Sequence, residues 1–405
     1  MRRIAVIGGG VTGCSVAWHL ADREAGEVHL FERDQLGSGT TWHSAGNVTW
    51  KPAGDDDAPV RYLLDLVRNL EAETGLTSGW RATGRLFLAR DGATLETFRP
   101  YHDEARARGL ESRMLSAREA AGQHPLLDAS PLAGAWLNPV SGHLNPADLV
   151  AVLARSAKGR GVRLHEMTRI DGLASAGGRV SGVRVGGEVH PFDDVVVAAG
   201  LWSAGLAAAE GAALAQGGCQ HFYIILDIEP RLAAGTPSFI STADLIYGRE
   251  EVGGLLLGCF DEEALTIDVA GLPDPFAFSL LNENWDKFMP YFEPAAELFP
   301  ALLEAPARRF VNGPEAFTPD GKPLIGAAPG VEGLWLATGM NSYGVTISAA
   351  AGHLIADLVT GAEPRFPAAA YAPERFGDAA RDPRWLHRRL ADAPSLFYRG
   401  ANPHA

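Results

Sequence analysis

Cysteine is scarce in this chain of 405 residues, which has three: Cys14, Cys219 and Cys259. Their number is odd and no two are spaced as C-x-x-C, so we expect no disulfide framework. A reducing compartment, the cytoplasm, fits this cysteine usage. We also expect no metal site.

Positive charge and long apolar runs are scarce as well. The 35 lysines and arginines are outnumbered by 49 aspartates and glutamates, which gives a net charge of −14. Nucleic-acid surfaces need clustered lysine and arginine, so we expect no nucleic-acid partner. No apolar run is long enough for a membrane span, and glycines interrupt the run in MRRIAVIGGGVTG that a signal peptide would need. With 46% hydrophobic and 21% charged residues, the composition fits a globular protein of up to two domains.

The first 32 residues follow a strand–turn–helix–strand pattern. Residues 4–7 form a continuous apolar run, which is typical of a parallel strand covered on both faces. Residues 8–13 (GGGVTG) provide a turn, residues 14–22 a helix and residues 28–32 a second strand. This order predicts the opening unit of a nucleotide-binding domain.

The turn fits the pattern G-x-G-x-x-G. Gly8 would allow the tight turn, Gly10 would let the backbone approach a pyrophosphate, and Gly13 would let the helix pack on the strand. Glu32 ends the second strand, where it could accept hydrogen bonds from a ribose diol, and Arg33 follows it as a further candidate contact. The motif predicts a dinucleotide site and leaves both NAD and FAD open. A glycine-rich turn without a ligand is the alternative.

Later segments alternate between helix and strand. Residues 58–75 carry apolar side chains at helical spacing and end on Gly75, a typical helix stop. A second helix is predicted to begin at Pro146, with Asn145 as its N-cap. The apolar run in residues 194–200 (DVVVAAG) predicts another buried strand.

The order of these elements predicts a mixed α/β fold with two interleaved domains. A Rossmann-like, cofactor-binding domain would take segments 1–47, 141–214 and 310–365. A sheet-rich substrate-binding domain would take segments 48–140 and 215–309. Residues 366–405 would form an irregular tail rich in proline and arginine.

A loop of small residues, GSGTTWHSAGN (37–47), follows the second strand. Small residues let a backbone lie close to a ligand, yet Trp42 and His43 sit in the middle of this loop. A histidine that makes a hydrogen bond within the loop is the simple interpretation. A histidine that reacts with the ligand is the other.

Six motifs occur in an order typical of one known family. They read VIGGGVTG, GTTWHSAG, GWRATGRLFLA, DVVVAAGLWS, NGPEAFTPDG and GLWLATGMNSYGVTISAAAG. With them, the chain resembles over residues 1–370 the FAD-dependent amine oxidoreductases of the D-amino-acid oxidase superfamily. Within it, the chain is most similar to the flavin half of the dimethylglycine and sarcosine dehydrogenases. The resemblance implies that FAD is the cofactor.

For the loop at 37–47 the resemblance implies a covalent role. In that family the histidine of the T-T-W-H motif is bonded to the 8α carbon of the flavin, and the matching residue is His43. A neutral imidazole is a suitable nucleophile for the electrophilic 8-methyl group. Monomeric sarcosine oxidases instead use a cysteine just before the T-P-D stretch. Here that stretch, NGPEAFTPD, contains no cysteine.

Other cofactor contacts follow from the family's motifs. The resemblance places Gly39, Thr40 and Thr41 near the flavin or its pyrophosphate, and Gly200 near the adenosine. The positive end of the helix at 345–360 would stabilise anionic reduced flavin. The candidate contacts in the loop before this helix are Gly339, Asn341, Tyr343 and Gly344.

On the substrate side the resemblance marks three candidate catalytic residues. His221 and Tyr223 match an H-x-Y pattern whose histidine lies over the flavin, and Tyr247 matches a second active-site tyrosine. A histidine there could tune or accept a proton. The alternative is that all three side chains pack inside a sheet.

The position that would bind a substrate carboxylate departs from the family. Sarcosine oxidases use a lysine in the helix-start motif, where this chain has Thr346. Arg249 is the substitute that we predict, with Lys51 and Arg81 as alternatives. The change leaves open whether the substrate is an N-methylated amino acid or a related amine.

These motifs predict an enzyme that oxidises the C–N bond of a small secondary or tertiary amine, such as sarcosine or dimethylglycine. Hydride transfer to the flavin would leave an imine, which water would split into formaldehyde and the demethylated amine. Oxygen or an electron-transfer flavoprotein would accept the electrons from the flavin. A partner subunit could supply the folate-binding half that the large dehydrogenases carry.

Two alternatives stay open. The first is a D-amino-acid or glycine-type oxidase with noncovalent FAD, which would not need His43. The second is the flavin subunit of a hetero-oligomeric complex whose active site is incomplete without its partner. Covalent attachment of the flavin separates the first alternative from the main prediction. Flavin reduction that requires a co-purifying chain would favour the second.

Overall fold

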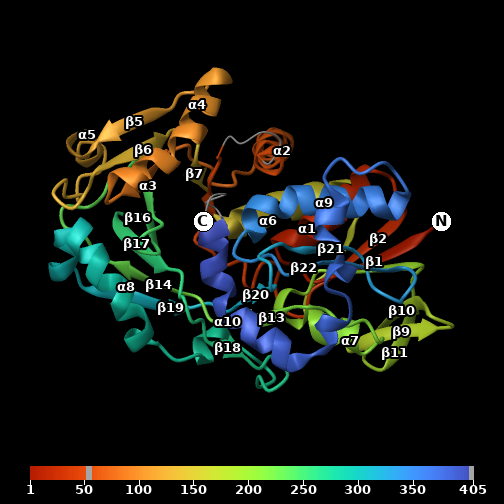
Figure 1. Ribbon diagram of the computed structural model, residues 1–405. Coiled ribbons are helices and arrows are strands. Elements are labelled where there is room, and N and C mark those ends of the chain that lie inside the picture. The colour runs from red at the N-terminus through yellow and green to blue at the C-terminus, as the bar shows by residue number, and fades with distance from the viewer. Residues whose placement is uncertain (52–56, 401–405) are drawn as a thin grey trace.

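The computed structural model describes residues 1–51 and 57–400. It shows a mixed α/β fold, as the sequence predicts, with a six-stranded sheet on the right of Figure 1 and an eight-stranded sheet on the left. The three cysteines are free and buried. Within the described residues, no helix combines the length and the apolar character that a membrane span requires.

The six-stranded sheet contains the strand–turn–helix–strand unit that the sequence predicts. Its order is β21 (Leu324–Ala327), β22 (Leu334–Thr338), β12 (Asp194–Val197), β1 (Arg3–Ile7), β2 (Glu27–Phe31) and β8 (Arg163–His165). All neighbours pair in parallel except β21, which runs antiparallel to β22. Three helices pack on one face of this sheet: α1 (Val11–Asp22), α6 (Pro146–Gly159) and α9 (Gly344–Thr360).

Strand β1 is buried on both faces. Ile4 and Val6 pack in the core that contains the three helices, whereas Ala5 and Ile7 pack in a second core on the opposite face. Because successive side chains of a strand alternate between faces, burial on both sides requires a continuous apolar run. The second core is covered by a three-stranded sheet with the order β11 (Glu188–Pro191), β10 (Arg179–Val185) and β9 (Gly172–Ala176), and by α7 (Ser203–Ala208).

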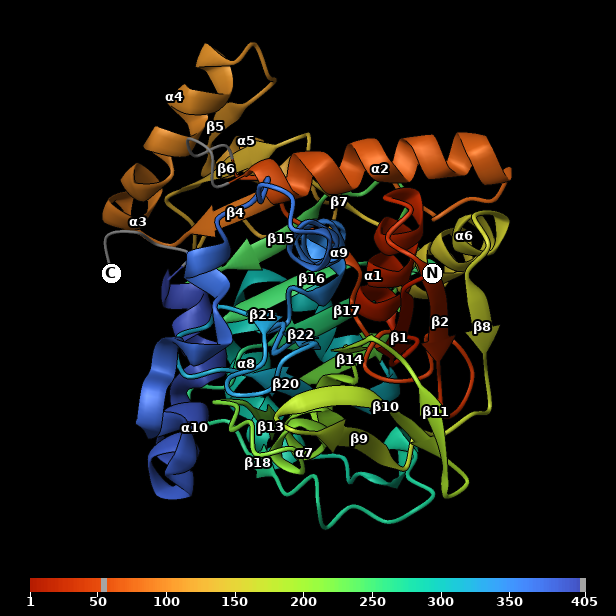
Figure 2. The ribbon, with the colours of Figure 1, turned by 90° about the vertical axis from the view of Figure 1, so that its right-hand side faces the viewer.

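The predicted helix boundaries are confirmed where capping residues were recognised. The side chain of Asn145 accepts hydrogen bonds from the backbone N–H groups of Ala147 and Asp148, at 3.0 and 3.3 Å, and so caps α6. Gly75 ends α2 (Ala58–Thr74) with a left-handed φ of 69°, which glycine adopts without strain. Helix α2 packs on α9 and α6 and lies across the top of Figure 2.

The eight-stranded sheet has one face toward its own helices and one toward the nucleotide-binding unit. Helices α5 (Ala117–Ala121) and α8 (Trp285–Leu298) pack on the first face. The second face carries Phe87, Tyr223 and Tyr247, and Ala45 from the loop at 37–47 packs against it. The strand order is β19 (Ala307–Asn312), β14 (Phe222–Leu226), β17 (Gly254–Cys259), β16 (Ile246–Glu251), β15 (Ser238–Ser241), β4 (Arg85–Ala89), β6 (Gly134–Asn138) and β5 (Arg113–Ser116).

Small elements complete the chain. One small sheet pairs β3 (Asn47–Val48) with β7 (Gly142–His143), and another has the order β18 (Thr266–Ile267), β13 (Gly217–Cys219) and β20 (Glu315–Phe317). The remaining helices are α3 (Gly92–Thr97), α4 (Arg99–Ala107), and the short 3-10 helices η1 (Gly200–Trp202), η2 (Phe278–Leu280), η3 (Pro300–Glu304), η4 (Ala368–Tyr371) and η5 (Pro373–Arg381). The proposed division into two discontinuous domains stays a prediction.

The expectation of an irregular tail after residue 365 is wrong for much of that region. Residues Pro383–Gly400 form α10, and residues 401–405 lie outside the described part. Leu390 and Ala393 of α10 are buried against Cys219 and Phe317. The helix forms because its apolar residues recur at helical spacing and find this core to pack on.

Two buried histidines predict that acid destabilises the fold. Desolvation lowers the pKa of His19 to about 3 and the pKa of His124 to about 4, from the usual 6.5. Both imidazoles stay neutral in the folded chain, whereas the unfolded chain takes up protons below pH 6.5. The free energy of unfolding should therefore fall between pH 6.5 and about 4, by about 1.4 kcal/mol per pH unit for each histidine.

Denaturant titrations across this pH window measure the slope. His124→Gln removes one of the buried neutral imidazoles, so its slope should be shallower by about 1.4 kcal/mol per pH unit. His190→Gln, at an exposed position, should leave the slope as it is in the wild type. A wild-type slope in His124→Gln would contradict the prediction.

Candidate active site and cofactor cavity

A cavity of about 1040 Å³ opens at the carboxyl ends of the parallel strands. Ile7 at the end of β1, Glu32 just after β2 and Thr338 at the end of β22 all line it. A doubly wound sheet places its ligand at this edge, where several strand ends meet. Segment 269–279, which precedes α8, lines much of the cavity from another side.

The glycine turn lies against this cavity with no room for side chains. Gly8 has a φ of 108°, and a Cβ on Gly13 would lie 1.8 Å from the carbonyl oxygen of Gly8. Helix α1 therefore packs directly on the turn, as the motif predicts. Thr41 Oγ1 accepts a hydrogen bond from the backbone N–H of Val11 at 3.1 Å, which fixes the loop at 37–47 to the first turn of α1.

Just after β2, a carboxylate and a guanidinium line the cavity. Glu32 accepts hydrogen bonds from the backbone N–H groups of Gly9 at 2.7 Å and Asp34 at 3.0 Å. Those bonds hold the carboxylate beside the glycine turn, as a ribose contact requires. The guanidinium of Arg33 lies 3.9 Å from the centroid of the Trp202 ring, and both side chains line the cavity.

Most of the predicted cofactor residues line this cavity. They are Gly8, Gly10, Glu32, Arg33, Gly39, Thr40, Thr41, Gly200, Gly339, Asn341 and Gly344. Gly13, His43 and Tyr343 are not among the described residues that line it, because Gly13 packs under the turn and Tyr343 lines a second cavity. Their contacts with FAD stay predictions.

His43 lies just behind the wall of the large cavity. Its neighbours Trp42 and Ser44 line that cavity, and so does Phe278, whose ring centroid is 4.7 Å from the ring of His43. The imidazole is 2% exposed, and its Nε2 has no hydrogen-bond partner within the described part of the chain. Desolvation, with a smaller effect of His221, lowers the pKa of His43 to about 3. The ring is therefore a neutral imidazole with an available nitrogen lone pair.

Gly313 is a site residue that the sequence analysis missed. A Cβ on Gly313 would lie 2.2 Å from Nδ1 of His43, so only glycine leaves room for the imidazole where it stands. The backbone N–H of Gly313 donates to the carbonyl of His221 at 2.8 Å, which ties the two histidine segments together. The signal was present, since Gly313 belongs to the NGPEAFTPDG motif.

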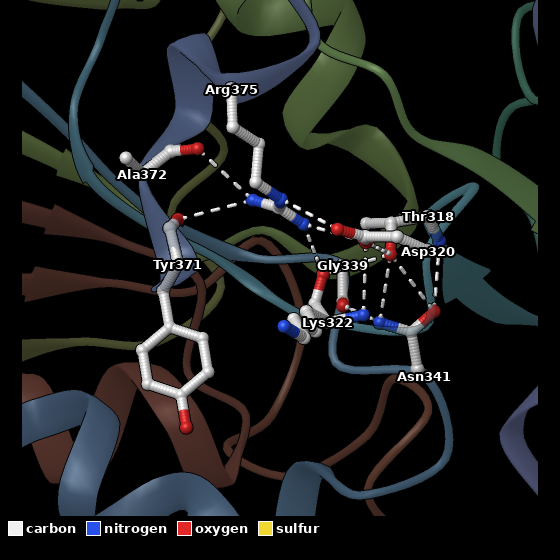
Figure 3. Close-up of polar contacts among 8 residues, drawn as sticks. All are labelled: Thr318, Asp320, Lys322, Gly339, Asn341, Tyr371, Ala372 and Arg375. Atoms are coloured by element: carbon white, nitrogen blue, oxygen red, sulfur yellow. Dashed lines mark hydrogen bonds and ion pairs between the residues drawn. The ribbon is translucent and has the colours of Figure 1, made fainter. Parts of the chain in front are cut away.

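The loop before α9 is held by a polar network. Asn341 and Ser342 have left-handed φ values of 49° and 64°. The side chain of Asn341 accepts from the backbone N–H of Thr318 at 2.8 Å and donates to the carbonyl of Gly339 at 2.5 Å. Figure 3 shows these contacts joined to a second group, in which Arg375 of η5 donates to both carboxylate oxygens of Asp320 at 2.8 and 2.9 Å. The network fixes the loop that leads into the N-terminus of α9.

A second cavity of about 90 Å³ adjoins the first. Ser44, Glu315, Ser342 and Val345 line both, so the two spaces share a wall. The second cavity is also lined by the predicted catalytic residues His221 and Tyr247, by Tyr343, and by Thr346 in the position of the expected lysine.

His221 and Tyr247 form a buried pair in the second cavity. His221 Nε2 and Tyr247 Oη lie 3.3 Å apart. Desolvation lowers the pKa of His221 and raises the pKa of Tyr247 well above 10, so both groups are neutral near neutral pH. The charges of Glu315 and Asp261 favour the protonated form of His221, against the effect of burial. The pair can exchange a proton with a bound amine.

Two predicted substrate residues lie elsewhere. Tyr223 is 8% exposed and packs in the core of the eight-stranded sheet, and the described residues that line the two cavities do not include it. Arg249 donates to the carbonyl of Ala45 at 2.6 Å and forms an ion pair with Glu251, also at 2.6 Å. It too is outside the described lining of both cavities.

Two charged residues in the second cavity were missed. Glu315 on β20 accepts a hydrogen bond from the hydroxyl of Ser342 at 2.6 Å and faces both cavities. Arg85, the first residue of β4, lines the second cavity together with Lys51. Both missed residues lie inside quoted motifs, NGPEAFTPDG and GWRATGRLFLA, and the sequence analysis considered only Arg81 among the residues of these motifs.

Known proteins share this sequence pattern and fold. The family described as "FAD dependent oxidoreductase" (DAO) matches residues 3–358. Human mitochondrial sarcosine dehydrogenase is 31% identical over 411 aligned residues, covering 99% of this chain and 44% of that protein. The formaldehyde-forming 4-methylaminobutanoate oxidase of Paenarthrobacter nicotinovorans is 30% identical, covering 98% of this chain and 48% of that protein. The chain thus spans less than half the length of these relatives.

A solved structure extends the comparison to the fold. L-proline dehydrogenase from P. horikoshii superposes with a TM-score of 0.80 at 25% identity, covering 93% of this chain and 97% of that one.

Proposed function

Because this chain belongs to the DAO family of FAD-dependent oxidoreductases, as its motifs predict, we propose that it oxidises the C–N bond of an N-methylated amino acid. The products would be formaldehyde and the demethylated amino acid. Two relatives support this substrate class by their names, sarcosine dehydrogenase and formaldehyde-forming 4-methylaminobutanoate oxidase.

The residues of the large cavity fit FAD. The N-terminus of α1 offers backbone N–H groups to a pyrophosphate, and Glu32 offers a carboxylate to a ribose. The buried Nε2 of His43 has no hydrogen-bond partner among the described residues, so it suits a covalent bond to the flavin. When bound, FAD supplies the acceptor for the hydride that leaves the carbon next to nitrogen.

The observation that carries the proposal is the small cavity beside the large one. A substrate amine there would meet the neutral pair of His221 and Tyr247, which lie 3.3 Å apart. An ammonium has no lone pair to assist oxidation, so the amine must lose its proton first, and the neutral imidazole can accept it. Apolar lining residues such as Ile240 and Phe260 limit the access of water.

The proposed reaction also needs an electron acceptor for the reduced flavin and a route for the one-carbon product. We propose that oxygen or an electron-transfer flavoprotein accepts the electrons. The aligned chain is less than half the length of these curated relatives. We propose that the one-carbon unit leaves as formaldehyde unless a partner subunit captures it.

Anaerobic reduction of the purified holoenzyme tests the proposal. Sarcosine, dimethylglycine and 4-methylaminobutanoate are compared with glycine and D-alanine, by bleaching of the flavin absorbance and by assay of formaldehyde and ammonia. We expect at least one N-methylated compound to bleach the flavin and to yield one formaldehyde per flavin reduced. Bleaching by glycine or D-alanine with release of ammonia would contradict demethylation and support the alternative amino-acid oxidase.

A further inference from the structure

Three side-chain amides and one backbone carbonyl form a hydrogen-bonded bridge next to the histidine segments. Oε1 of Gln220 accepts hydrogen bonds from Nδ2 of Asn284 at 2.7 Å and from Nδ2 of Asn312 at 2.8 Å. The same Nδ2 of Asn312 donates to the backbone carbonyl of Asn282 at 2.9 Å. This amide bridge joins the residues just before β14, the end of β19 and the segment before α8.

The polarity of the amide bridge follows from the carbonyl of Asn282. A backbone carbonyl only accepts hydrogen bonds, so the side-chain atom of Asn312 that faces it must be the nitrogen. The same nitrogen also bonds to Gln220, which must therefore present its oxygen. Gln220 is thus the acceptor of the bridge and Asn312 is a donor. These roles decide which substitutions preserve the bridge.

The amide bridge lies one residue away from both histidine segments. Gln220 comes directly before His221 in the chain. Asn312 comes directly before Gly313, where a Cβ would lie 2.2 Å from Nδ1 of His43. The backbone N–H of Gly313 donates to the carbonyl of His221 at 2.8 Å. The bridge therefore holds the chain next to both ends of this backbone hydrogen bond.

The amide bridge also anchors the segment that packs on His43. The ring of Phe278 lies 4.7 Å from that of His43. Within the described part of the chain, residues 268–281 make backbone–backbone hydrogen bonds only among themselves. Asn282 and Asn284, directly after this segment, attach it to the two strands. Asn284 stands at the N-cap of α8 but makes no side-chain capping bond, because its amide binds Gln220 instead.

The bridge leaves one polar atom without a partner. Asn312 is 7% exposed, and its Oδ1 has no hydrogen-bond partner within the described residues. A buried amide oxygen without a partner destabilises a fold, so such groups are rare and call for an explanation. A requirement for the donor of Asn312 at this position supplies one.

We propose that Gln220 and Asn312 are positioning residues of the cofactor site. Their bridge holds Gly313 and Phe278 against the imidazole of His43, and thereby orients the imidazole for its bond to the flavin. The proposal rests on the covalent role of His43 in the proposed function. Addition of the imidazole to the 8α carbon leaves the flavin with two more electrons and with two protons, one from the ring nitrogen and one from the methyl group. Oxygen then reoxidises the flavin and is reduced to hydrogen peroxide.

The rate of flavin attachment tests the bridge. The intact chain is produced under riboflavin limitation, mixed with saturating FAD and sampled into acid, and the fluorescence of the flavin that stays with the polypeptide is measured over time. Gln220→Leu removes the acceptor and Asn312→Asp removes the donor. Each should slow attachment by about tenfold or more, because a displacement of about 1 Å is enough for such losses. Gln220→Glu keeps an acceptor oxygen and should stay within about twofold of the wild type.

A matched control separates the bridge from a general effect of losing an amide. Gln123→Leu makes the same change at another half-buried glutamine and should attach flavin at the wild-type rate. Melting temperatures show which variants are folded, and the two Gln220 variants decide alone if Asn312→Asp does not fold. Equal slowing in Gln220→Glu and Gln220→Leu would show that position 220 acts only through packing and would overturn the proposal. A wild-type rate in Gln220→Leu would overturn it as well.

The outcome is separate from that of the amine panel. Attachment needs no amine, so a panel in which no N-methylated compound bleaches the flavin leaves this test intact. If FAD never becomes attached to the wild type, the covalent role of His43 and the proposed role of the bridge fail together. Demethylation is then still judged by the amine panel alone.

Discussion

Replacing His43 with alanine is expected to release the flavin from the polypeptide completely. When wild-type protein is precipitated with acid, the yellow chromophore should stay with the chain, and a peptide containing residues 37–47 should carry the added mass of FAD. In His43→Ala the chromophore should wash out, because no imidazole is left to form the bond. The buried, neutral ring of His43 and its Nε2 without a partner in the described structure support this expectation.

Two variants show whether the effect is specific to that imidazole. His124→Gln removes another buried, neutral histidine, which packs against Phe239 and Phe299 in a core of the eight-stranded sheet, and should keep the flavin attached. Gly313→Ala should lower the attached fraction, because its Cβ would lie 2.2 Å from Nδ1 of His43 and must displace the ring. If FAD washes out of fully loaded wild-type protein, the covalent role is refuted. The amino-acid oxidases with noncovalent FAD then become the better interpretation.

The cofactor half was predictable because its signals are local. The turn at 8–13 specifies its own geometry, since a Cβ on Gly13 would lie 1.8 Å from the carbonyl oxygen of Gly8. The continuous apolar run of β1 predicts that both faces of this strand are covered. Such signals need only neighbouring residues, so the first strand, turn and helix could be placed from sequence alone.

The substrate cavity depends on contacts between distant segments. Arg85 follows the sequence TG and precedes LFLA, a pattern that predicts a strand but not what its first side chain faces. Its position comes from the pairing of β4 with β15 and β6, whose residues lie about 50 to 150 positions further along the chain. Glu315 faces both cavities only because β20 pairs with β13. Charged residues that come together through the pairing of distant strands have no fixed spacing in the sequence by which they could be recognised.

The prediction of an irregular tail over the residues of α10 was wrong for a different reason. Pro383 begins it and Pro394 lies inside it, and prolines were read as signs of irregular chain. Pro383 at the first position is favourable for a helix. Leu386 and Leu390 are four residues apart and Ala393 follows after three, which is the helical pattern that the proline content concealed.

Loss of His221 is expected to have the largest effect on the reaction itself. His221→Ala should slow reduction of the flavin by the reactive amine by about 10²- to 10⁴-fold, the range for removal of a positioned proton acceptor. Tyr247→Phe removes only the hydroxyl 3.3 Å from Nε2 of His221, so its effect should be about tenfold or less. Tyr223→Phe should have the smallest effect of the three, because Tyr223 packs in the sheet core rather than in the described wall of the cavity.

The pH profile distinguishes a proton acceptor from a packing residue. His221 accepts a proton only when neutral, so the rate is full above its pKa and falls as the pH drops through it. Burial lowers this pKa from 6.5, against the charges of Glu315 and Asp261, so the acidic limb of the wild-type profile should lie below pH 6.5. In His221→Ala the residual rate should lack this limb and keep only the limb of the substrate amine. A variant profile of wild-type shape at a lower rate would show that His221 only shapes the cavity.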